Sequence, residues 1–381
     1  MKKKVFTSLG LMTGTSMDGV DLSIIKSDGY SEFTAILDKY YEFDDDLRKK
    51  LTNLRRKIYL SSDLKKYSDE LQLIEKKLTL FHSNIVSEVL NKYNDHVDLV
   101  GFHGQTIFHN SQEKISIQLG DGKLLSQIIK KIVINNFRQN DLENDGQGAP
   151  LTPIFHQLIS NILSKKNKIR FPINIINIGG ISNITQIIEN DQTKSFDLKA
   201  FDIGPGNCLI DNWVRKNSDK QFDKNGDIAK SGKVDDLIYN QAIDNFSKNL
   251  YLQSLDINDF DISFVKGLSL ENGCATLTKF SAYLIAKGIE YINDSNNFLT
   301  KNLVCGGGRK NIFLIENINK FLSPKKIYLE NIDNYELAGD FIESQGFAYL
   351  AIRSYLGLPI SFPSTTGCKL PTKGGTYNKN F

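Results

Sequence analysis

One local plan occurs twice in this sequence, and it limits the folds that the chain can adopt. Residues 9–25 place a Gly/Ser/Thr/Asp turn between two apolar runs, and residues 173–188 repeat the order of strand, small polar turn and strand. A glycine-rich turn between two apolar runs predicts a β-hairpin. In the first hairpin Val20, Leu22 and Ile24 alternate with polar residues, as a strand with one buried face requires. We therefore expect two related halves, each beginning with a hairpin.

Helix and strand patterns alternate in the rest of the chain. Apolar residues recur at intervals of three or four from residue 64 to residue 89, in a long helix expected to begin at Ser62. This alternation predicts an α/β protein whose loops at the strand ends carry the ligands. Further strands are expected at 97–102, 115–119, 131–137 and 303–305 and in a run that ends at Asp202, and further helices at about 206–215 and 339–356.

The length of 381 residues exceeds one ordinary domain and predicts two lobes. We expect the first lobe, which begins with the first hairpin, to span residues 1–135 and to be completed by residues 357–381. The second lobe, residues 136–356, would hold the second hairpin turn, Asp202 and the glycine turn at residues 306–308.

The composition excludes several classes of protein. Apolar residues make up 40% and charged residues 24% of the chain, which is the balance of a soluble globular protein. Membrane association is not expected, because no run approaches the roughly 20 apolar residues that a bilayer span needs. The 47 basic and 44 acidic residues give a net charge of +3 and are interspersed, so nucleic acid is not an expected partner. A cytoplasmic location is expected, since Lys2–Lys4 lead into a strand-like run and not into a secretory leader.

Cysteine and histidine spacing gives no support for a structural metal. Neither Cys-x-x-Cys nor His-x-x-x-His occurs. Reduced, mostly buried thiols are expected at the four cysteines, Cys208, Cys274, Cys305 and Cys368.

Glycine-rich turns are the candidate nucleotide-binding segments. Neither a P-loop nor a Gly-x-Gly-x-x-Gly fingerprint is present. Glycine lets backbone N–H groups approach phosphate oxygens closely, and neighbouring hydroxyl and amide groups add donors. Each turn alone is better explained as a plain hairpin, but two such turns at the starts of the two halves favour phosphate binding. The added donors are Thr13, Thr15 and Ser16 in the first turn and Ser182 and Asn183 in the second.

A third turn, Gly306-Gly307-Gly308, follows an apolar strand. Three glycines there would let a flat ring approach the backbone, which suits adenine or ribose. A plain strand-to-helix turn explains the same residues, and the sequence leaves the two readings open.

Two aspartates lie beside the phosphate turns. Asp18 is either a turn-capping residue or a ligand that holds Mg²⁺ directly or through water. Asp202 ends an apolar run just before Gly204-Pro205-Gly206 and an expected helix N-terminus, where backbone donors are plentiful. We expect Asp202 to be catalytic.

Three further polar residues have less determined roles. His103 follows a strand and is either a base or a hydrogen-bonded structural residue. Arg138 lies in a polar loop, from which it could clamp a substrate carboxylate. Glu343 lies on a helix and either serves the site or faces solvent.

Taken together, six ordered motifs resemble the anhydro-N-acetylmuramic acid kinases of the actin/hexokinase/heat-shock-chaperone ATPase superfamily, and the resemblance spans essentially the whole chain. It implies an α/β fold with two ribonuclease-H-like lobes and a cleft between them for ATP and sugar. The motifs are Gly10–Asp21, His103-Gly104-Gln105-Thr106, Gly146–Leu151, Asn177–Asn183, Phe201–Asn207 and Val304–Gly308.

The resemblance also implies roles for residues. Asp202 falls at the catalytic base, Arg138, His103 and Glu343 fall where the family contacts the muramic sugar, and a homodimer is expected of the family. ATP and Mg²⁺ are the implied cofactors, with Asp18 as the candidate metal ligand. The candidate ATP-binding residues are Gly14, Thr15, Ser16, Met17, Asp18, Gly19, Val20 and Asp21 in the first turn, Gly179, Gly180, Ser182 and Asn183 in the second, and Gly306, Gly307 and Gly308 in the third.

The chain departs from the family pattern at two positions of the expected sugar loop. Asn136 stands where the family usually carries Asp, and Asp145 where it usually carries Gly. The departures bear on the sugar-binding loop and not on the fold or the ATP turns.

The family's reaction turns 1,6-anhydro-N-acetylmuramic acid, ATP and water into N-acetylmuramic acid 6-phosphate and ADP during cell-wall recycling. Asp202 would then deprotonate the water that attacks C1. Two other functions remain open from the residues alone. One is a different sugar or acetate-type kinase on the same fold, and the other is a chaperone or filament ATPase in which nucleotide drives partner binding.

Overall fold

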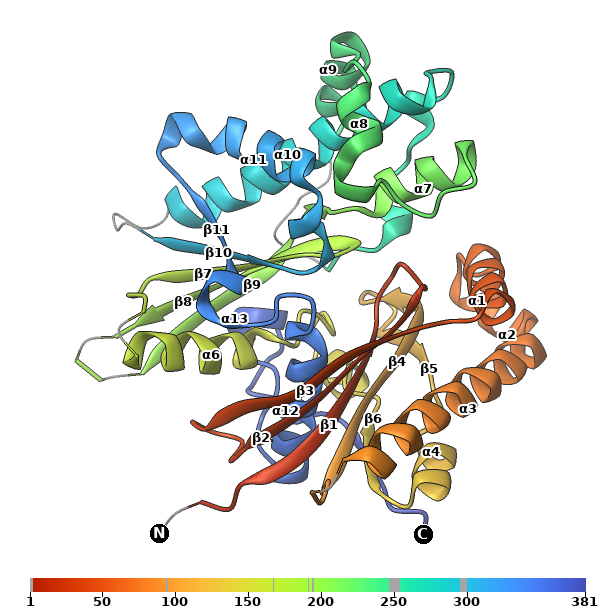
Figure 1. Cartoon of the computed structure of the whole chain (residues 1–381), viewed down its shortest axis with the longest axis vertical. Coiled ribbons are helices and arrows are strands. Elements are labelled where there is room, and N and C mark those ends of the chain that lie inside the picture. The colour runs from red at the N-terminus through yellow and green to blue at the C-terminus, as the bar shows by residue number, and fades with distance from the viewer. Residues whose placement is uncertain are drawn as a thin grey trace. The chain divides into compact units, whose positions relative to one another are not determined.

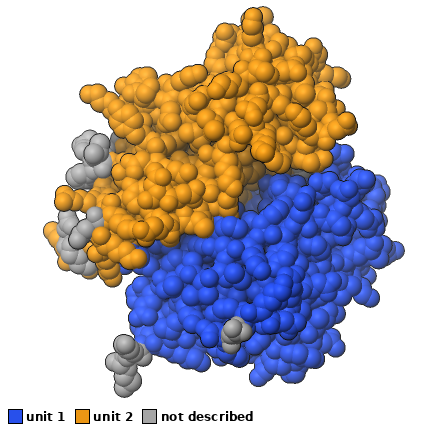
Figure 2. All heavy atoms as spheres, in the orientation of Figure 1, with its two compact units in different colours: residues 1–162, 341–381 blue, residues 163–340 orange. Residues whose placement is uncertain are grey.

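Two β-sheets, each with its own helices, make up the computed structural model of the chain (Figure 1). The structure describes residues 3–93, 95–166, 168–190, 192–193, 195–246, 254–294 and 300–381. The chain divides into unit 1, residues 1–162 with 341–381, and unit 2, residues 163–340 (Figure 2). Each unit contains one of the sheets.

The sheet of unit 1 has the strand order β12-β6-β4-β1-β2-β3, with β5 paired to the second half of β4. Strand β2 runs antiparallel to β1 and β3, whereas β4 and β6 run parallel to β1. Its elements are β1 (Phe6–Thr13), β2 (Gly19–Ser27), β3 (Phe33–Glu42), α1 (Asp45–Lys57), α2 (Ser61–Lys66), α3 (Ser68–Lys92), β4 (Leu99–Asn110), β5 (Ile115–Leu119), α4 (Gly122–Ile129), β6 (Ile132–Asn135), α5 (Gln139–Glu143), α6 (Pro153–Lys165), α12 (Ile342–Tyr355), α13 (Pro363–Thr366) and β12 (Thr376–Asn378).

The sheet of unit 2 has the order β11-β10-β7-β8-β9, with β8 antiparallel to β7 and β9 and with β10 and β11 parallel to β7. Its elements are β7 (Ile173–Ile178), β8 (Ile181–Glu189), β9 (Phe196–Pro205), α7 (Cys208–Asn217), η1 (Lys224–Gly226), α8 (Asp227–Ser231), α9 (Asp236–Asp244), η2 (Ile257–Asp259), η3 (Ser263–Val265), α10 (Leu270–Asp294), β10 (Lys301–Cys305), η4 (Gly307–Lys310), α11 (Ile312–Leu322), η5 (Ser323–Lys325), β11 (Leu329–Asn331) and η6 (Ile332–Tyr335).

Both sheets have the same topology. When β5 and β12 of unit 1 are left out, the remaining five strands of each unit, numbered along the chain, lie in the order 3-2-1-4-5. Strand 2 alone is antiparallel to its neighbours in this set. This is the ribonuclease-H-like arrangement. The expected α/β fold with two related halves is confirmed, and both expected hairpins are present as β1–β2 and β7–β8.

The units divide the chain at other positions than the sequence suggested. Residues 136–162 and 341–356, expected in the second lobe, belong to unit 1. The Phe155 ring of α6 packs against Phe33 of β3, with ring centroids 5.1 Å apart, and α12 packs on β1, β2 and β4. The apolar pattern of a helix shows that one face is buried, but it does not show which sheet buries it.

Several element boundaries also differ from the sequence-based ones. β4 continues through His103 to Asn110, because its second half pairs with β5, and β9 continues past Asp202 to Pro205, because it pairs with β8. The long helix is interrupted at Tyr67, whose φ of −107° and ψ of 24° separate α2 from α3. The predicted apolar face of this helix is nevertheless correct. All of its positions, Leu64, Tyr67, Leu71, Ile74, Leu78, Phe81, Ile85 and Val89, belong to or pack against the unit 1 core.

Helices cover both faces of the unit 1 sheet. Leu9 and Leu11 of β1 face a core shared with α1 and α3, while Gly10 between them faces α12. Gly10 pairs in register with Gly101 of β4, so α12 lies over two neighbouring glycines. A Cβ atom at Gly10 would lie 2.0 Å from the Ser344 carbonyl oxygen of α12. Glycine is therefore required at this contact for steric reasons.

We expect Gly101→Ala to lower the free energy of unfolding of unit 1 by about 3 kcal/mol, because the methyl group would lie 2.3 Å from the backbone oxygen of Phe347. Gly14→Ala is the matched control, since its Cβ would meet only Ser16 Oγ, at 3.7 Å. Denaturant unfolding without ligands measures both variants. Equal losses in the two would contradict the close packing of α12.

Candidate active site

Two strands parallel to β4, β1 and β6, end beside residues 102–105 of β4 in the unit 1 sheet. β1 ends at Thr13, opposite Gln105 of β4 in the register, and β6 ends at Asn135 beside β4. Loops that follow parallel strands meet at one edge of a sheet. The first glycine-rich turn, His103 and Arg138 are therefore brought to the same end of unit 1.

The first turn joins β1 to β2 and presents polar groups at its tip. Thr15 and Ser16 are exposed, and the Ser16 hydroxyl donates to Asp18 Oδ1 at 2.6 Å. Met17 adopts a left-handed φ of 56°, and its N–H lies 3.3 Å from the Gly14 carbonyl oxygen. Exposed backbone amides and hydroxyls at a tight turn are suitable donors for phosphate oxygens.

Two buried side chains hold the base of this turn. Gln105 Nε2 donates to the Gly14 carbonyl oxygen at 3.1 Å. His82 Nδ1 donates to the Leu78 carbonyl oxygen at 2.8 Å, which leaves Nε2 to accept from the Thr13 hydroxyl at 3.4 Å. Burial lowers the pKa of His82 to about 4, so its ring is neutral at pH 7. The Thr13 hydroxyl, an expected phosphate donor, thus faces the interior.

The remaining residues of the first segment lie in β2 and not in the turn. Val20 is part of the unit 1 core, so only its backbone can serve a ligand. Gly19 is covered by a tyrosine, because a Cβ there would lie 2.6 Å from the Tyr40 hydroxyl. Asp21 pairs in register with Met12 of β1. The groups of this segment that lie in the turn, and not in β2, are thus at residues 14–18.

His103 and Arg138 are in direct contact. Arg138 donates to His103 Nε2 through Nη2 at 2.9 Å and Nε at 3.3 Å, and Nη1 donates to the Gly148 carbonyl oxygen at 2.8 Å. His103 Nδ1 donates to the Gly104 carbonyl oxygen at 2.7 Å, and the ring packs on Phe347. Burial and the adjacent guanidinium lower the pKa of His103 to about 3. His103 is therefore neutral and fixes the plane of the Arg138 guanidinium.

Glu343 occupies the first turn of α12 and is half-buried. The residues after it anchor the helix to the sheet: Ser344 Oγ lies 2.6 Å from Ser23 Oγ, and Gln345 Nε2 donates to both Asp38 oxygens at 3.0 and 3.1 Å. Burial raises the pKa of Asp38, against the effect of its hydrogen bonds. The position of Glu343 therefore depends on α12 and the strands beneath it.

Both departures from the family pattern occur at left-handed backbone positions. Asn136 has a φ of 54° and Asp145 a φ of 65°. Glycine adopts this conformation without strain, and asparagine and aspartate tolerate it better than other residues do. Lys114 and Lys369 pair with Asp145 and lower its pKa to about 2. The backbone of the loop thus accommodates both residues.

The predicted residues of unit 2 also gather at one end of their sheet. Cys305 pairs with Asn177 in the register, Ile178 pairs with Ser182, and Asn183 pairs with Asp202. The second turn and the third glycine turn therefore follow the neighbouring strands β7 and β10, and Asp202 lies near the carboxyl end of β9 at the same edge of the sheet. This group and the group in unit 1 belong to different units.

The second turn contacts the start of α7 closely. The Gly179 carbonyl accepts from the Asn207 N–H at 2.9 Å, and the Gly180 carbonyl accepts from the Gly206 N–H at 2.8 Å. A Cβ at Gly206 would lie 2.2 Å from the Gly179 oxygen. Only glycine allows this approach, so the motifs at 177–183 and 201–207 form one structure.

Polar atoms beside this turn are buried. Within the part of the chain that the structure describes, Ser182 Oγ and Asn183 Oδ1 have no hydrogen-bond partner. Buried polar atoms are nearly always hydrogen-bonded, which makes these two suited to a ligand. Asp202 is 6% exposed, and its Oδ2 accepts the Leu255 N–H at 2.7 Å. The Leu255 N–H thus holds the Asp202 carboxylate in one orientation.

The third turn approaches the backbone of β7. Gly306 has a φ of 81°, and a Cβ there would lie 2.3 Å from Asn177 Oδ1. At Gly308 a Cβ would lie 2.2 Å from a side-chain carbon of Ile178, whereas at Gly307 it would meet nothing within 4 Å. Two glycines are therefore required by packing, and Gly307 leaves space for a ligand.

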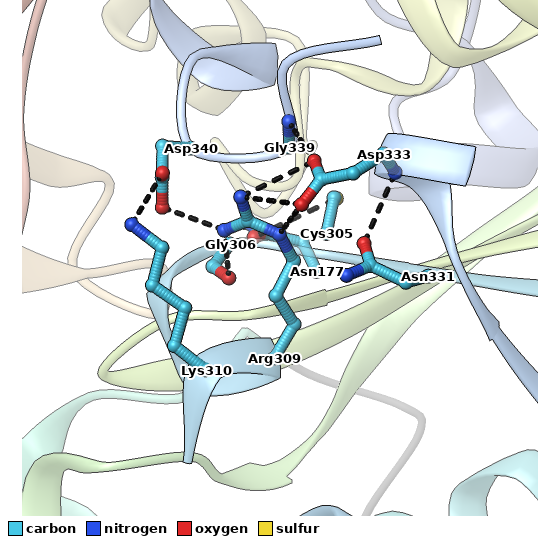
Figure 3. A network of polar contacts seen from close by, with 9 residues as sticks. All are labelled: Asn177, Cys305, Gly306, Arg309, Lys310, Asn331, Asp333, Gly339 and Asp340. Atoms are coloured by element: carbon cyan, nitrogen blue, oxygen red, sulfur yellow. Dashed lines mark hydrogen bonds and ion pairs between the residues drawn. The ribbon is translucent and has the colours of Figure 1, made fainter. Parts of the chain in front are cut away.

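A buried arginine fixes this turn, as Figure 3 shows. Arg309 Nη1 donates to the Gly306 carbonyl oxygen at 3.0 Å and to Asp340 Oδ1 at 2.6 Å, and Nε donates to Asp333 Oδ2 at 3.0 Å. Asp333 also accepts the Gly339 N–H at 2.8 Å. Burial opposes ionisation, but both carboxylates outweigh it and raise the pKa of Arg309. The turn is thereby tied to residues 331–340.

Sequence reasoning missed the residues that support the predicted ones. Gln105, Arg309 and Asp340 were given no role, although Gln105 lies in a quoted motif and Arg309 directly follows the glycine triplet. Their partners are not local: Asp340 lies 31 residues from Arg309. The sequence signal for Gln105 and Arg309 was that each is a polar residue within or next to a motif. Such a position suggests a supporting role but does not identify the residue's partner.

The described residues contain no group of three or more His, Cys, Asp or Glu side chains that could hold a metal ion. None of the described helices is both long and apolar enough to cross a membrane. All four cysteines are buried thiols, as expected.

Comparisons with known proteins point to one family over nearly the whole chain. A model of the family described as anhydro-N-acetylmuramic acid kinase matches residues 6–379. The protein of that name from Pelagibacter ubique is 54% identical over 382 residues, covering 100% of each chain. The protein of the same name from Zymomonas mobilis is 36% identical, and the match covers 97% of this chain and 98% of that protein. The one from Rhodospirillum rubrum is 34% identical, and the match covers 97% of this chain and 93% of that protein.

We expect Arg309→Ala to lower the free energy of unfolding of unit 2 by about 2 kcal/mol, since it leaves two carboxylates and the Gly306 carbonyl without their shared donor. Lys310→Ala is the matched control. It removes an exposed partner of Asp340, which should cost no more than about 1 kcal/mol. Denaturant unfolding followed by circular dichroism compares them, and similar losses would argue against a structural role for the buried guanidinium.

Proposed function

The chain belongs to the anhydro-N-acetylmuramic acid kinase family, and from this premise we propose that it converts 1,6-anhydro-N-acetylmuramic acid, ATP and water to N-acetylmuramic acid 6-phosphate and ADP. The observation that carries the mechanism is the buried Asp202 carboxylate beside the second glycine turn. The product would return cell-wall sugar to amino-sugar metabolism.

We assign ATP binding to the three glycine turns. The turn at residues 14–18, where Thr15 and Ser16 are exposed, supplies amide and hydroxyl donors for phosphate, and Ser182 and Asn183 supply buried polar atoms. The space above Gly307 suits a flat adenine or ribose ring. The assignment rests on the chemistry of the donors in each turn.

Asp202 is proposed as the general base. The substrate has no free 6-hydroxyl group, because O6 is bonded to C1 in the anhydro bridge. A water must therefore add its oxygen to C1 while the C1–O6 bond breaks, and O6 takes the γ-phosphoryl group as ADP leaves. Asp202 accepts the proton of the water, and the Leu255 N–H holds the carboxylate in position for that transfer.

Mg²⁺ is proposed at the phosphates, where it would neutralise their charge. Asp18 suits this role, because it is partly exposed at the first turn and only one of its oxygens accepts the Ser16 hydroxyl. Mg²⁺ is commonly held by one or two carboxylates together with substrate phosphates.

Recognition of the sugar is assigned to Arg138, His103 and Glu343. A planar guanidinium matches a carboxylate by two parallel hydrogen bonds, so Arg138 would grip the lactyl group that distinguishes muramic acid from glucosamine. Neutral His103 cannot repel that guanidinium and would hold it in one plane. We also propose a cytoplasmic homodimer, in keeping with the need for ATP and with the family resemblance.

Arg138→Ala should raise KM for the anhydro sugar about ten- to a hundredfold while KM for ATP stays within about twofold, because a charge-assisted bond to the sugar is lost. Arg138→Lys, which keeps the charge but not the paired geometry, should fall between the two. Steady-state kinetics with each substrate varied in turn measures the effect. A raised KM for ATP alone would place Arg138 elsewhere.

Turnover in ¹⁸O-water should label the C1 hydroxyl of the product and leave the phosphate unlabelled, because water attacks carbon and not phosphorus. Asp202→Asn should lower kcat by about 10² to 10⁴ with both substrates still bound, since the amide cannot accept the proton. Asp197→Asn, an exposed carboxylate on the same strand, is the control and should keep normal turnover.

Label in the phosphate would rule out this mechanism, and near-normal kcat in Asp202→Asn would rule out the residue. Faster phosphorylation of free N-acetylmuramic acid or N-acetylglucosamine than of the anhydro sugar would show that the chain acts on another acceptor.

A further inference from the structure

A buried aspartate outside the assigned site ties together the loop beneath Arg138. Asp141 lies in α5, is 1% exposed, and accepts three hydrogen bonds through its carboxylate. Oδ2 accepts the Gly148 N–H at 2.7 Å, while Oδ1 accepts the hydroxyls of Ser361 at 2.5 Å and Thr366 at 2.7 Å. One carboxylate thus joins the loop at residues 146–150 to the C-terminal segment.

The geometry of the loop requires this contact. A Cβ at Gly146 would lie 2.1 Å from Asp141 Oδ2, so only glycine lets the loop pass over the carboxylate. The Asp141 backbone oxygen accepts the Gly146 N–H at 2.8 Å, and Gly148 has a left-handed φ of 71°. The Gln147 N–H donates to the Thr366 carbonyl oxygen at 2.7 Å, a second link to the C-terminal segment.

Gly148 links Asp141 to Arg138 through two hydrogen bonds. Its N–H is held by Asp141, and its carbonyl oxygen accepts Arg138 Nη1 at 2.8 Å. On its other side the guanidinium bonds to His103 Nε2. The orientation of Arg138 is therefore set from two directions, by His103 on β4 and by the loop that Asp141 holds.

We propose that Asp141 is a positioning residue for the sugar, acting through Gly148 to hold the Arg138 guanidinium in the plane that binds the substrate carboxylate. The proposal rests on the proposed function in one respect, that Arg138 contacts the sugar. The two carboxylate oxygens of Asp141 form two arms with different tasks. The Oδ2 arm positions the loop and Arg138, whereas the Oδ1 arm attaches the C-terminal segment.

The two arms can be separated by substitution. Asp141→Ala removes both, and a double variant, Ser361→Ala with Thr366→Val, removes only the hydroxyl partners of Oδ1. Asp141→Asn is the conservative variant, because its amide oxygen can accept the Gly148 N–H while its NH₂ group donates to the hydroxyls. Arg138→Ala supplies the reference for a lost guanidinium.

Two measurements apply to each folded variant. The ¹⁵N shift of His103 Nε2 reports its hydrogen bond to Arg138 in the whole chain, without any substrate. The five histidine signals can be assigned by single substitutions. Steady-state kinetics then gives KM for the sugar, KM for ATP and kcat.

Asp141→Ala should move the His103 shift toward that of Arg138→Ala and raise KM for the sugar about tenfold, with KM for ATP unchanged. Asp141→Asn should recover most of both effects. The double variant should lose thermal stability yet keep the wild-type His103 shift and KM for the sugar.

A wild-type His103 shift in folded Asp141→Ala overturns the proposal, as does an equal rise of KM in the double variant. A moved shift with unchanged KM for the sugar also overturns it when Arg138→Ala does raise that KM. If Arg138→Ala leaves KM unchanged as well, the moved shift still supports positioning of Arg138 by Asp141, and the assignment of Arg138 to the sugar fails instead.

Discussion

The close contact between α12 and the paired glycines of β1 and β4 is the constraint on which unit 1 depends. Gly10 and Gly101 lie side by side in the register, and each would place a Cβ within 2.3 Å of a backbone oxygen of α12. The contact covers the second face of the sheet and places Phe347 against His103, with ring centroids 4.5 Å apart. The same helix carries Glu343, so sheet packing and the proposed sugar contacts share one element.

Repetition of one sheet topology explains where the candidate residues lie. In each unit strand 2 is antiparallel to its neighbours and the fourth and fifth strands run parallel to the first, so loops from several strands emerge at one edge. Unit 1 places its hairpin turn, His103 and Arg138 there, and unit 2 places its two glycine turns and Asp202. Each unit therefore needs only short loops to gather polar groups.

Buried charge in both units is held by several partners at once. The Arg309 guanidinium is shared by Asp333, Asp340 and the Gly306 carbonyl, and the Asp141 carboxylate is shared by an amide and two hydroxyls. A buried charge is costly unless its hydrogen-bonding capacity is filled, and a filled network allows few other geometries. Each network is hydrogen-bonded to a loop proposed to bind or support ATP or sugar, and a fixed loop keeps its ligand-binding groups in position.

The sequence alone determined the two hairpins, the three glycine turns, the buried face of the long helix and the family, because these depend on local pattern and on motif order. It also identified Asp202, His103 and Arg138 as candidates. Tertiary structure decided that residues 341–356 belong to unit 1, that β4 continues through His103, and that His103 is neutral against Arg138. Asp38 and Gln345, 307 residues apart, show the reason. Periodicity reports that a face is buried, whereas its partners are set by contacts between distant segments that form only when the sheets pack.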